Sequence, residues 1–383
     1  MGLPVRKELQ SPIRYTDFGL LGSALLIALI GVATNYSATW RQLEFDGSDP
    51  AFFAKRQAVF VLLGVLAMIG AATVDYRFFR DFASQAYLVV LALLVAVLFL
   101  GVERNGARAW FELPGLAFQL QPAEFAKVAV VLSLAAFVSS HEGFLKLDAL
   151  VNALLLVAVP MGLIFVQPDI GTMLIFVAIA MGMLLVAGAQ VRHIVATTLI
   201  GLIAILGVFN IDDLGGPALL RQTQENRLTA FLDPEFDPDG ASYNLLQSQI
   251  AIGAGGLTGQ GWTQGTQTNL NLVPEQQTDF IFTALAEEFG FVGAVGLLGL
   301  YGWMIFRMWR IAHTARDLFG TFLCVGLMSM FLFQIFQNIG MTLGIMPITG
   351  IPLPFMSHGG SSTVVAFGSV GLILNVGARR HMP

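Results

Sequence analysis

Three carboxylates stand in one apolar stretch, 273-VPEQQTDFIFTALAEEFGFVG-293. Carboxylates act in proteins as acids, bases and nucleophiles, and they are costly inside a membrane. Along a helix, eight residues separate Asp279 from Glu287 by about 12 Å, and Glu288 points roughly opposite to Asp279. Carboxyl pairs that cleave sugars lie roughly 5–9.5 Å apart. We therefore expect separate roles: Asp279 as a reactive group or a first-turn cap behind Thr278, and the two glutamates as hydrogen-bonding partners of other helices.

Two further charges lie in the apolar segment 120-LQPAEFAKVAV-130. Glu124 and Lys127 are three residues apart, so on a helix they share a face. Two interpretations stay open. They form an ion pair that neutralises itself, or they line a polar cavity, since charges within a membrane generally face a bundle interior or water.

The segment 347-PITGIPLPFMSHGGSSTVVAF-367 contains three prolines and cannot be one continuous helix. Irregular backbone at membrane depth is tolerated only when it is buried in protein or lines a cavity. Gly359, Gly360, Ser361 and Ser362 then open the next apolar run. A glycine-rich turn at a helix N-terminus offers N–H groups to an anion such as phosphate, and a re-entrant packing loop is the alternative. His358 has no metal-ligand spacing with another histidine, which indicates a polar loop residue.

These residues belong to a chain of 383 residues that is 56% hydrophobic and only 12% charged. Soluble domains carry about 25% charged residues, so the composition predicts an all-α, polytopic membrane protein. The net charge of −5 and the absence of a basic block argue against nucleic acid as a partner. Cys324 is the only cysteine, which excludes a disulfide within the chain.

Apolar runs long enough to cross a bilayer predict about ten transmembrane helices in a single membrane domain, residues 1–383. The first run should stay as an anchor, because it is too long for a cleaved signal. Gln167 to Asp169 should form a tight hairpin between the fifth and sixth spans. The expected spans are 17–38, 56–75, 83–102, 122–139, 149–167, 169–188, 192–209, 279–305, 318–345 and 356–377.

The distribution of lysine and arginine orients these spans. An even number of spans puts both termini on one side, and a cytoplasmic N-terminus gives twelve basic residues inside against seven outside. The positive-inside rule therefore predicts that both termini are cytoplasmic. The inner residues are Arg6, Lys7, Arg14, Arg77, Arg80, Lys146, Arg192, Arg307, Arg310, Arg316, Arg379 and Arg380. The outer residues are Arg41, Lys55, Arg56, Arg104, Arg108, Arg221 and Arg227.

This orientation makes residues 210–278 a large extracytoplasmic loop. It contains the turn-forming run 231-FLDPEFDPDG-240 and then the apolar stretch 243-YNLLQSQIAIGAGGLTGQGW-262. One interpretation is a surface loop with an interfacial helix. The other is a cap over a site at the outer face, because long loops in compact proteins are often functional.

Together these motifs resemble the SEDS family (shape, elongation, division and sporulation). The matching segments run from the third span's outer loop to the last span and cover most of the chain. The TGIPLPF form resembles the elongation branch, and His358 departs from the tyrosine that is common in the family. The segments are 106-GARAWFELPGLAFQLQPAEFAK-127, 167-QPDIGT-172, 227-RLTAFLDPEFDP-238, 253-GAGGLTGQGW-262, 274-PEQQTDFIFTALAEEFG-290 and 338-NIGMTLGIMPITGIPLPFMSHGGSS-362.

The resemblance implies a peptidoglycan glycosyltransferase that polymerises lipid II into β-1,4 glycan strands at the outer face of the cytoplasmic (inner) membrane. It also implies a class B penicillin-binding protein as the transpeptidase partner, with other proteins of the elongation complex. The family's essential carboxylate matches Asp279. An α-linked donor and a β-linked product suit one inverting displacement, in which Asp279 as general base takes the proton of the acceptor's GlcNAc 4-hydroxyl.

The leaving pyrophosphate needs positive charge or N–H donors. Candidates are Lys127, oriented by Glu124, together with Arg108, Arg227 and the turn from Gly359 to Ser362. Trp110 either stacks on a sugar or anchors the chain at the interface. A divalent cation could share the task, although no ligand motif requires one.

Two other classes of function stay open. A lipid II flippase would use broken helices and midplane charges, but the chain shows no internal repeat and its polar features concentrate at the outer face. A non-catalytic scaffold would only recruit the synthase. Synthesis of glycan in detergent distinguishes an enzyme from both.

Overall fold

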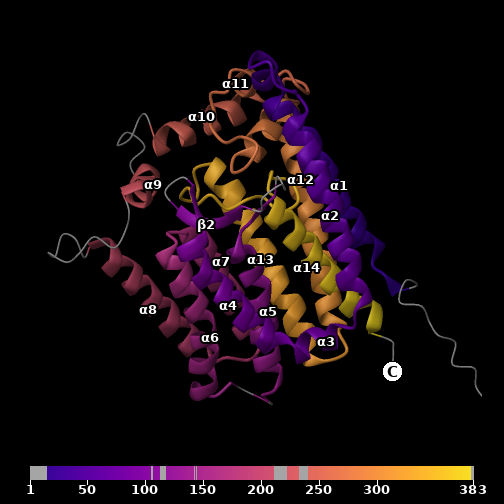
Figure 1. The fold of residues 1–383 in the computed structure, drawn as a ribbon, viewed down its shortest axis with the longest axis vertical. Coiled ribbons are helices and arrows are strands. Elements are labelled where there is room, and N and C mark those ends of the chain that lie inside the picture. Colours follow the sequence, from indigo (N-terminus) through magenta and orange to yellow (C-terminus); the bar gives the residue numbers. More distant parts are fainter. Residues whose placement is uncertain are drawn as a thin grey trace, which may run out of the picture.

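The structure is a computed structural model and describes residues 15–104, 107–112, 118–141, 143, 145–210, 222–232 and 240–380. Long helices form a bundle that is capped at one end by shorter elements (Figure 1). The long helices are α1 (Phe18–Phe45), α2 (Phe52–Thr73), α4 (Ala83–Leu100), α5 (Pro122–Ser139), α6 (Leu147–Val166), α7 (Ile170–Val186), α8 (Val191–Asn210), α12 (Ile281–His313), α13 (Leu318–Thr342) and α14 (Gly360–Arg379). The short helices are α3 (Tyr76–Asp81), α9 (Gln222–Leu232), α10 (Ala241–Ala254) and α11 (Thr266–Asn269).

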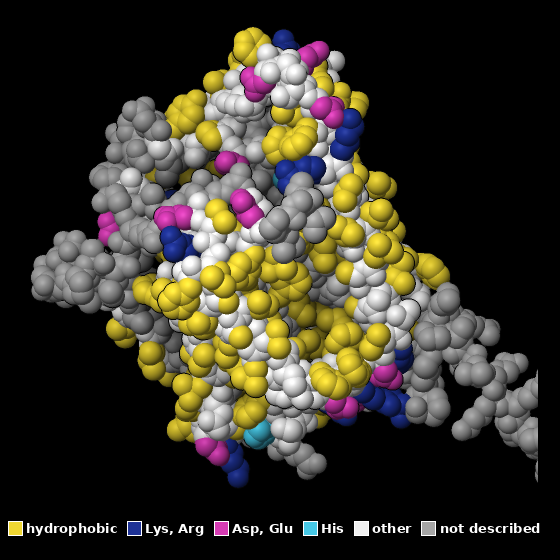
Figure 2. Space-filling model, in the orientation of Figure 1, with side chains coloured by type: hydrophobic (Ala, Val, Ile, Leu, Met, Phe, Trp, Pro, Cys, Tyr) yellow, Lys and Arg dark blue, Asp and Glu magenta, His cyan; other side chains and the backbone are white. Residues whose placement is uncertain are grey.

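Eight of these helices are long and apolar enough to cross a membrane, and α7 and the first part of α8, Val191–Gly201, are shorter apolar helices. Figure 2 shows hydrophobic side chains over the middle of the visible face and charged side chains toward its two ends. The expected multi-pass, predominantly helical membrane protein is confirmed. Eight of the ten expected spans correspond to these eight helices, and α7, with 17 residues, is slightly shorter than they are. In α8 the stretch Val191–Gly201 is apolar overall, as the expected span requires.

Several helix boundaries differ from the expected ones. α1 continues to Phe45 instead of ending near residue 38, so it projects beyond the bundle. The last helix begins at Gly360 and not at residue 356, because Phe355 has a positive φ of 66° and Gly359 is extended. Both conformations are incompatible with a helix.

A small antiparallel sheet follows α4, where the sequence predicted no strands. It contains β1 (Val102–Arg104), β2 (Ala107–Glu112) and β3 (Gln119–Leu120) in the order β1-β2-β3. Side chains alternate along β2, with Arg108 exposed and Ala109 buried, as a half-buried strand requires. The sheet therefore fixes the directions of Arg108 and Trp110, which lie on the same strand.

Small residues let α2 and α14 approach closely. A Cβ atom on Gly371 would stand 2.4 Å from the carbonyl oxygen of Met68, and one on Gly64 would stand 2.6 Å from the ring of Phe367. Helices in membranes pack through such small residues because no hydrophobic force drives them together in lipid. Buried side chains of the long helices form one core cluster. The irregular segment before α14 belongs to this cluster through Ile351, Leu353, Phe355 and Met356.

Ionic contacts close the lower end of the bundle, where α3 and both described chain ends lie (Figure 1). Arg307 of α12 binds Asp17, with 2.6 Å between Nη2 and Oδ2. Arg379 of α14 lies 3.6 Å from Asp75. The opposite, upper end carries the sheet, α9, α10 and α11, so the two described chain ends share the side away from the long loop.

The described part of that loop, residues 222–232 and 240–278, contains α9, α10 and α11. The expected interfacial helix within 243–262 corresponds to α10, which ends at Ala254, and the rest of that stretch is non-helical. Residues 233–239 of the turn-forming run lie outside the described residues.

α12 is broken at Gly290, whose φ of 64° and ψ of −162° interrupt the helix. The span expected over 279–305 is confirmed by α12, but the sequence did not predict the break. The glycine-rich segment 255–261 fills the break and supplies partners to its backbone, as buried N–H and carbonyl groups require. The N–H groups of Gln260 and Gly261 donate to the carbonyls of Glu287 and Glu288, and those of Phe291 and Val292 donate to the carbonyls of Gly256 and Leu257, at 2.9–3.1 Å.

Candidate active site

Asp279 lies in a tight turn, residues 274–280, directly before α12. The N–H groups of Thr278, Asp279 and Phe280 all point to the carbonyl of Glu275, at 3.1, 3.2 and 3.4 Å. Phe280 is the N-cap of α12, and no side chain caps this helix. The capping alternative for Thr278 and Asp279 is therefore wrong. Asp279 is half-buried, and no side chain or backbone group in the described part of the chain donates a hydrogen bond to its carboxylate.

Two segments distant in the sequence meet at this carboxylate. A Cβ atom on Gly350 would stand 3.3 Å from Oδ2 of Asp279 and 3.8 Å from Nη1 of Arg227. Gly350 also has a φ of 71°, which side chains other than glycine rarely adopt. Arg227 is exposed on α9, and Gln224 of the same helix donates to the carbonyl of Pro168 at 3.0 Å. The Arg227 guanidinium and the Asp279 carboxylate thus both lie next to Gly350.

Asp169 is a second carboxylate of this site, and the sequence reasoning missed it as a site residue. It caps α7 by accepting from the N–H and Oγ1 of Thr172 at 2.9 and 2.8 Å. Its Oδ2 lies 3.4 Å from Nε2 of Gln121. The sequence did contain a feature that could have identified Asp169, because this residue belongs to the QPDIGT motif at the expected hairpin between two spans. Its charge acts on Asp279.

Burial raises the pKa of Asp279 to about 6. The Arg227 guanidinium opposes this rise in pKa, while the negative charges of Glu275 and Asp169 add to it. A carboxylate with a pKa near 6 is a stronger base than an ordinary aspartate and is still mostly ionised at neutral pH. The site therefore places a carboxylate of raised pKa next to one cation. Within the ranges that the structure describes, no group of three or more His, Cys, Asp or Glu residues could hold a metal ion.

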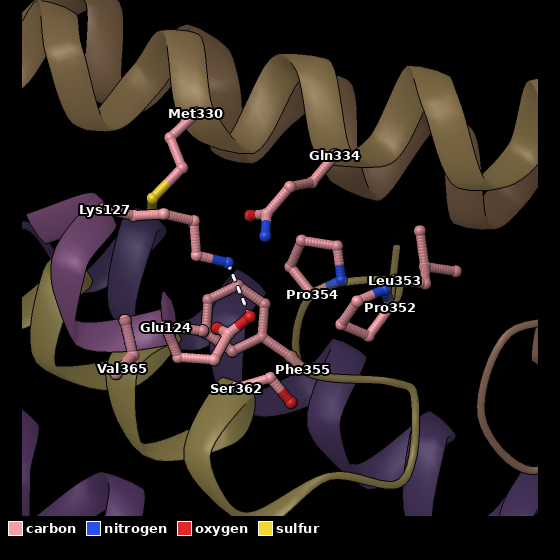
Figure 3. A pocket seen from close by; sticks show the side chains of 11 residues that line it. Glu124, Lys127, Met330, Gln334, Pro352, Leu353, Pro354, Phe355, Ser362 and Val365 are labelled. Carbon is pink, nitrogen blue, oxygen red and sulfur yellow. Dashed lines mark hydrogen bonds and ion pairs between the residues drawn. The ribbon is translucent and has the colours of Figure 1, made fainter. Parts of the chain in front are cut away.

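Lys127 and Glu124 form a buried ion pair, with 2.7 Å between Nζ and Oε1. Figure 3 shows that both point into a small pocket between α5, α13 and the proline-containing segment before α14. The pocket measures about 10 Å³, the scale of one water molecule. Both sequence interpretations hold, since the pair neutralises itself and lines a cavity. The charges that act on Asp279 are those of Arg227, Glu275 and Asp169, and Lys127 is not among them.

The two candidates on the sheet lie at the upper end of the bundle. Arg108 is exposed, and its Nη2 is 3.7 Å from Oε2 of Glu103. Trp110 is half-buried and lies opposite Val102 in the β1–β2 pairing. A long ion pair between exposed side chains holds Arg108 only weakly, so this arginine is available to an incoming anion.

The turn from Gly359 to Ser362 packs against its neighbours. Ser361 donates to the carbonyl of Gln119 at 2.8 Å and accepts from the N–H of Gln121 at 3.0 Å. A Cβ atom on Gly360 would lie 2.8 Å from the ring of Phe118. The N–H of Gly359 donates to Gln57. Ser362 lines the pocket of the Lys127 pair (Figure 3). The packing interpretation of this turn is confirmed, and its anion-binding role stays a prediction.

His358 connects the segment before α14 to the turn of Asp279. Its N–H donates to the carbonyl of Gln277 at 2.7 Å. Its ring packs edge-on against Phe53 and lies 5.5 Å from the ring of Phe60. Burial and the nearby Arg56 lower the pKa of His358 to about 4, so the ring is neutral at physiological pH. These contacts support a structural role for this residue.

Glu287 and Glu288 hold the outer loop to α12. Glu287 accepts from the N–H groups of Gln267 and Thr268 at 2.7 and 3.0 Å and from the hydroxyls of Thr266 and Thr268 at 3.2 and 2.7 Å. Glu288 binds the hydroxyl of Ser37 and the N–H of Thr263. The expected structural role is confirmed, although most of the partners lie in the loop and only Ser37 lies on another long helix.

The chain matches known proteins along nearly its whole length. A family model described as "cell cycle protein", which covers FtsW, RodA and SpoVE, matches residues 19–382. The stage V sporulation protein E of Bacillus subtilis is 40% identical over 94% of this chain and 96% of its own length. The peptidoglycan glycosyltransferase MrdB of Escherichia coli K12 is 39% identical over 84% of this chain and 85% of its own length.

A solved structure of a peptidoglycan synthase complex, in which polymerisation and crosslinking are coordinated, contains a chain with the same fold. That chain is 31% identical, with a TM-score of 0.78 over 96% of this chain and 99% of the other. The relatives include a sporulation protein and peptidoglycan glycosyltransferases named FtsW, MrdB and RodA, so these matches do not distinguish the branches of the family. The chain belongs to the FtsW/RodA/SpoVE family, the SEDS family that its motifs resemble.

Proposed function

We propose that this chain is a peptidoglycan glycosyltransferase that polymerises lipid II into β-1,4 glycan strands, in the elongation branch of its family. Relatives named as peptidoglycan glycosyltransferases support the reaction. The observation that carries the proposal is Asp279, a half-buried carboxylate with a raised pKa, which lies beside the exposed Arg227 at the upper end of the bundle. A sugar headgroup on a membrane lipid would arrive at this depth.

The proposed reaction is a single inverting displacement. Asp279 takes the proton of the acceptor's GlcNAc 4-hydroxyl, and that oxygen forms a bond to C1 of the donor sugar. The C1–O bond to the pyrophosphate breaks, and its electron pair leaves with the phosphate oxygen. Because a base works best when its pKa lies near the operating pH, the raised pKa of Asp279 favours this role.

The leaving pyrophosphate carries negative charge that needs compensation. Arg227 is the leading candidate, because it already lies at the Asp279 carboxylate. Arg108, with Trp110 on the same strand, is a second candidate at the upper end. Lys127 with Glu124 and the turn from Gly359 to Ser362 complete the set, and Lys127 would need its closed pocket to open before it could contact substrate.

The broken helix α12 would favour a lipid flippase only if its break formed a substrate site. Here the backbone groups at Gly290 bind the segment 255–261 instead. A scaffold without activity would not need an Asp279 carboxylate to which no described residue donates a hydrogen bond. Both observations support the enzyme over these alternatives.

We further propose that the site faces the extracytoplasmic side of the cytoplasmic (inner) membrane and that both termini are cytoplasmic. The basic residues Arg307, Arg310, Arg379 and Arg380 lie toward the lower end, as the positive-inside rule requires. A class B penicillin-binding protein and other elongation proteins are the proposed partners. The similar chain in a peptidoglycan synthase complex supports a transpeptidase partner.

Replacement of the base tests the proposal. Asp279→Asn keeps the shape of the side chain, so the purified variant should fold and co-purify with its transpeptidase partner. It should make no glycan from lipid II in detergent, a loss of at least about 100-fold, which is the usual contribution of a general base. Polymerisation at the wild-type rate by this variant would exclude Asp279 as the base.

A further inference from the structure

We infer that Asn338 is a positioning residue for Asp279, because one side-chain amide of α13 ties the Asp279 turn to the segment that contains Gly350. This inference rests on the proposed function. The Asn338 side chain is fully buried. Its Nδ2 donates to the carbonyl of Asp279 at 2.8 Å and to the carbonyl of Ile351 at 2.8 Å.

The Asp279 carbonyl lies just outside α12. The first backbone bond of the helix runs from the N–H of Thr283 to the carbonyl of Phe280, one residue further along. The donor for Asp279 therefore comes from Asn338, and not from the helix. Buried carbonyls need a donor, so this amide determines where the turn rests.

The second acceptor, Ile351, is next to Gly350, whose α-carbon faces the Asp279 carboxylate. Both Asp279 and Ile351 belong to irregular backbone, and neither is held by a helix or a strand at that point. The same amide thus sets the spacing between the base and the glycine beneath it. A displacement of about 1 Å of a catalytic group can reduce turnover about 100-fold.

Other contacts hold the surroundings of the turn but act further from Asp279. Ser248 joins Thr283 at 2.7 Å and the carbonyl of Thr342 at 2.9 Å. The N–H of His358 donates to the carbonyl of Gln277. Among the described residues, Asn338 is the one side chain that hydrogen-bonds Asp279 itself.

The neighbouring residue provides a matched control. Gln337 is also fully buried on α13, and its Nε2 donates at 2.8 Å to the carbonyl of Pro347, in the same irregular segment. Gln337→Leu removes one buried hydrogen bond to that segment and leaves the Asp279 turn untouched. A general loosening of the segment would affect both variants equally.

The experiment compares Asn338→Leu, Gln337→Leu and Asp279→Asn in the full chain, co-purified with its transpeptidase partner and supplied with lipid II in detergent. We expect Asn338→Leu to lower kcat at least about tenfold with KM for lipid II within about twofold of wild type. Gln337→Leu should keep kcat within about threefold. The acid limb of the pH–rate profile should move in Asn338→Leu and stay in place in Gln337→Leu, because only the first variant moves Asp279 relative to Arg227, Glu275 and Asp169.

If Asn338→Leu does not fold, Asn338→Gln keeps a donor but moves it by one methylene, and it should give the same loss of kcat with a smaller change in thermal stability. Wild-type kcat in a folded Asn338 variant, or equal losses in the Asn338 and Gln337 variants, would overturn the inference. A different result, polymerisation of lipid II by Asp279→Asn, would contradict the proposed function itself.

Discussion

Asp279 and Glu287 are acidic residues eight positions apart in one motif, yet their surroundings are opposite. Glu287 is fully buried and accepts four hydrogen bonds from the first three residues of α11, residues 266–268. Asp279 is half-buried, and within the described residues no group donates to its carboxylate. Its surroundings provide charges instead, from Arg227, Glu275 and Asp169.

The surroundings of a carboxylate control both its pKa and the access of a substrate to its oxygens. Donors that satisfy all the oxygens of a buried carboxylate stabilise its charge and reduce its reactivity. Burial without donors raises the pKa of a carboxylate and leaves its oxygens free for a substrate. Three predictions test this contrast.

The largest effect should come from Glu287→Ala. It leaves the N–H groups of the half-buried Gln267 and the buried Thr268 without an acceptor, so we expect the free energy of unfolding to fall by about 3–5 kcal/mol. Thermal unfolding in detergent measures this loss, and glycan synthesis should fall with the folded fraction. An unchanged melting temperature would show that α11 does not depend on Glu287.

Asp279→Asn is the matched variant for stability. Because the folded-state pKa of Asp279, about 6, lies above its ordinary value of 3.8, ionisation of this group destabilises the fold as the pH rises from about 4 to about 6. The asparagine variant should therefore melt no lower than wild type at pH 7, in contrast to Glu287→Ala.

An intermediate effect is expected from Gly350→Ala. The new Cβ would stand 3.3 Å from Oδ2 of Asp279 at a backbone φ of 71°, so it both strains the backbone by about 1–2 kcal/mol and crowds the reactive oxygen. We expect turnover to fall about tenfold. Gly47→Ala is the control, because Gly47 has a φ of 68° and open space around its Cβ position. Equal activity losses in the two variants would exclude a role for crowding.

The smallest effect on stability should come from Arg227→Gln, because the Arg227 side chain is exposed. Arg227 holds the pKa of Asp279 down against burial, so its removal should raise this pKa further. The acid limb of the pH–rate profile, near pH 6 in wild type, should move to higher pH by up to about one unit. Activity would then fall more at pH 6.5 than at pH 8. Arg108→Gln should leave the acid limb in place, and a limb that stays fixed in Arg227→Gln would contradict the assigned environment of Asp279.

The sequence predicted what depends on local pattern. The long apolar runs gave the positions of the helices, although α1 and α12 extend seven and eight residues beyond their expected ends, at Phe45 and His313. The i,i+3 spacing of Glu124 and Lys127 predicted their contact. The helical geometry that separated Asp279 from Glu287 predicted that their surroundings differ, which the structure confirms, although Asp279 itself lies two residues before the helix.

The sequence could not predict features that depend on distant partners. The break at Gly290 is stabilised by segment 255–261, which forms hydrogen bonds with the backbone groups on both sides of the break. The local sequence around Gly290 does not indicate that this segment is the partner. Asp279, Arg227 and Gly350 meet from three separate segments, so only tertiary packing brings them together. The short strands β1–β3 depend on pairing with one another, because segments of two to six residues carry little strand signal of their own.

The break in α12 also has a consequence for the order in which a growing chain can mature. Segment 255–261, which fills the break, leaves the ribosome before α12 does, so this joint can form as soon as α12 emerges. Two residues at Asp279, Asn338 and Gly350, arrive much later, since they belong to the last part of the chain. A partly translated protein can therefore hold its outer loop in place while its reactive centre stays incomplete until the final two helices have been inserted.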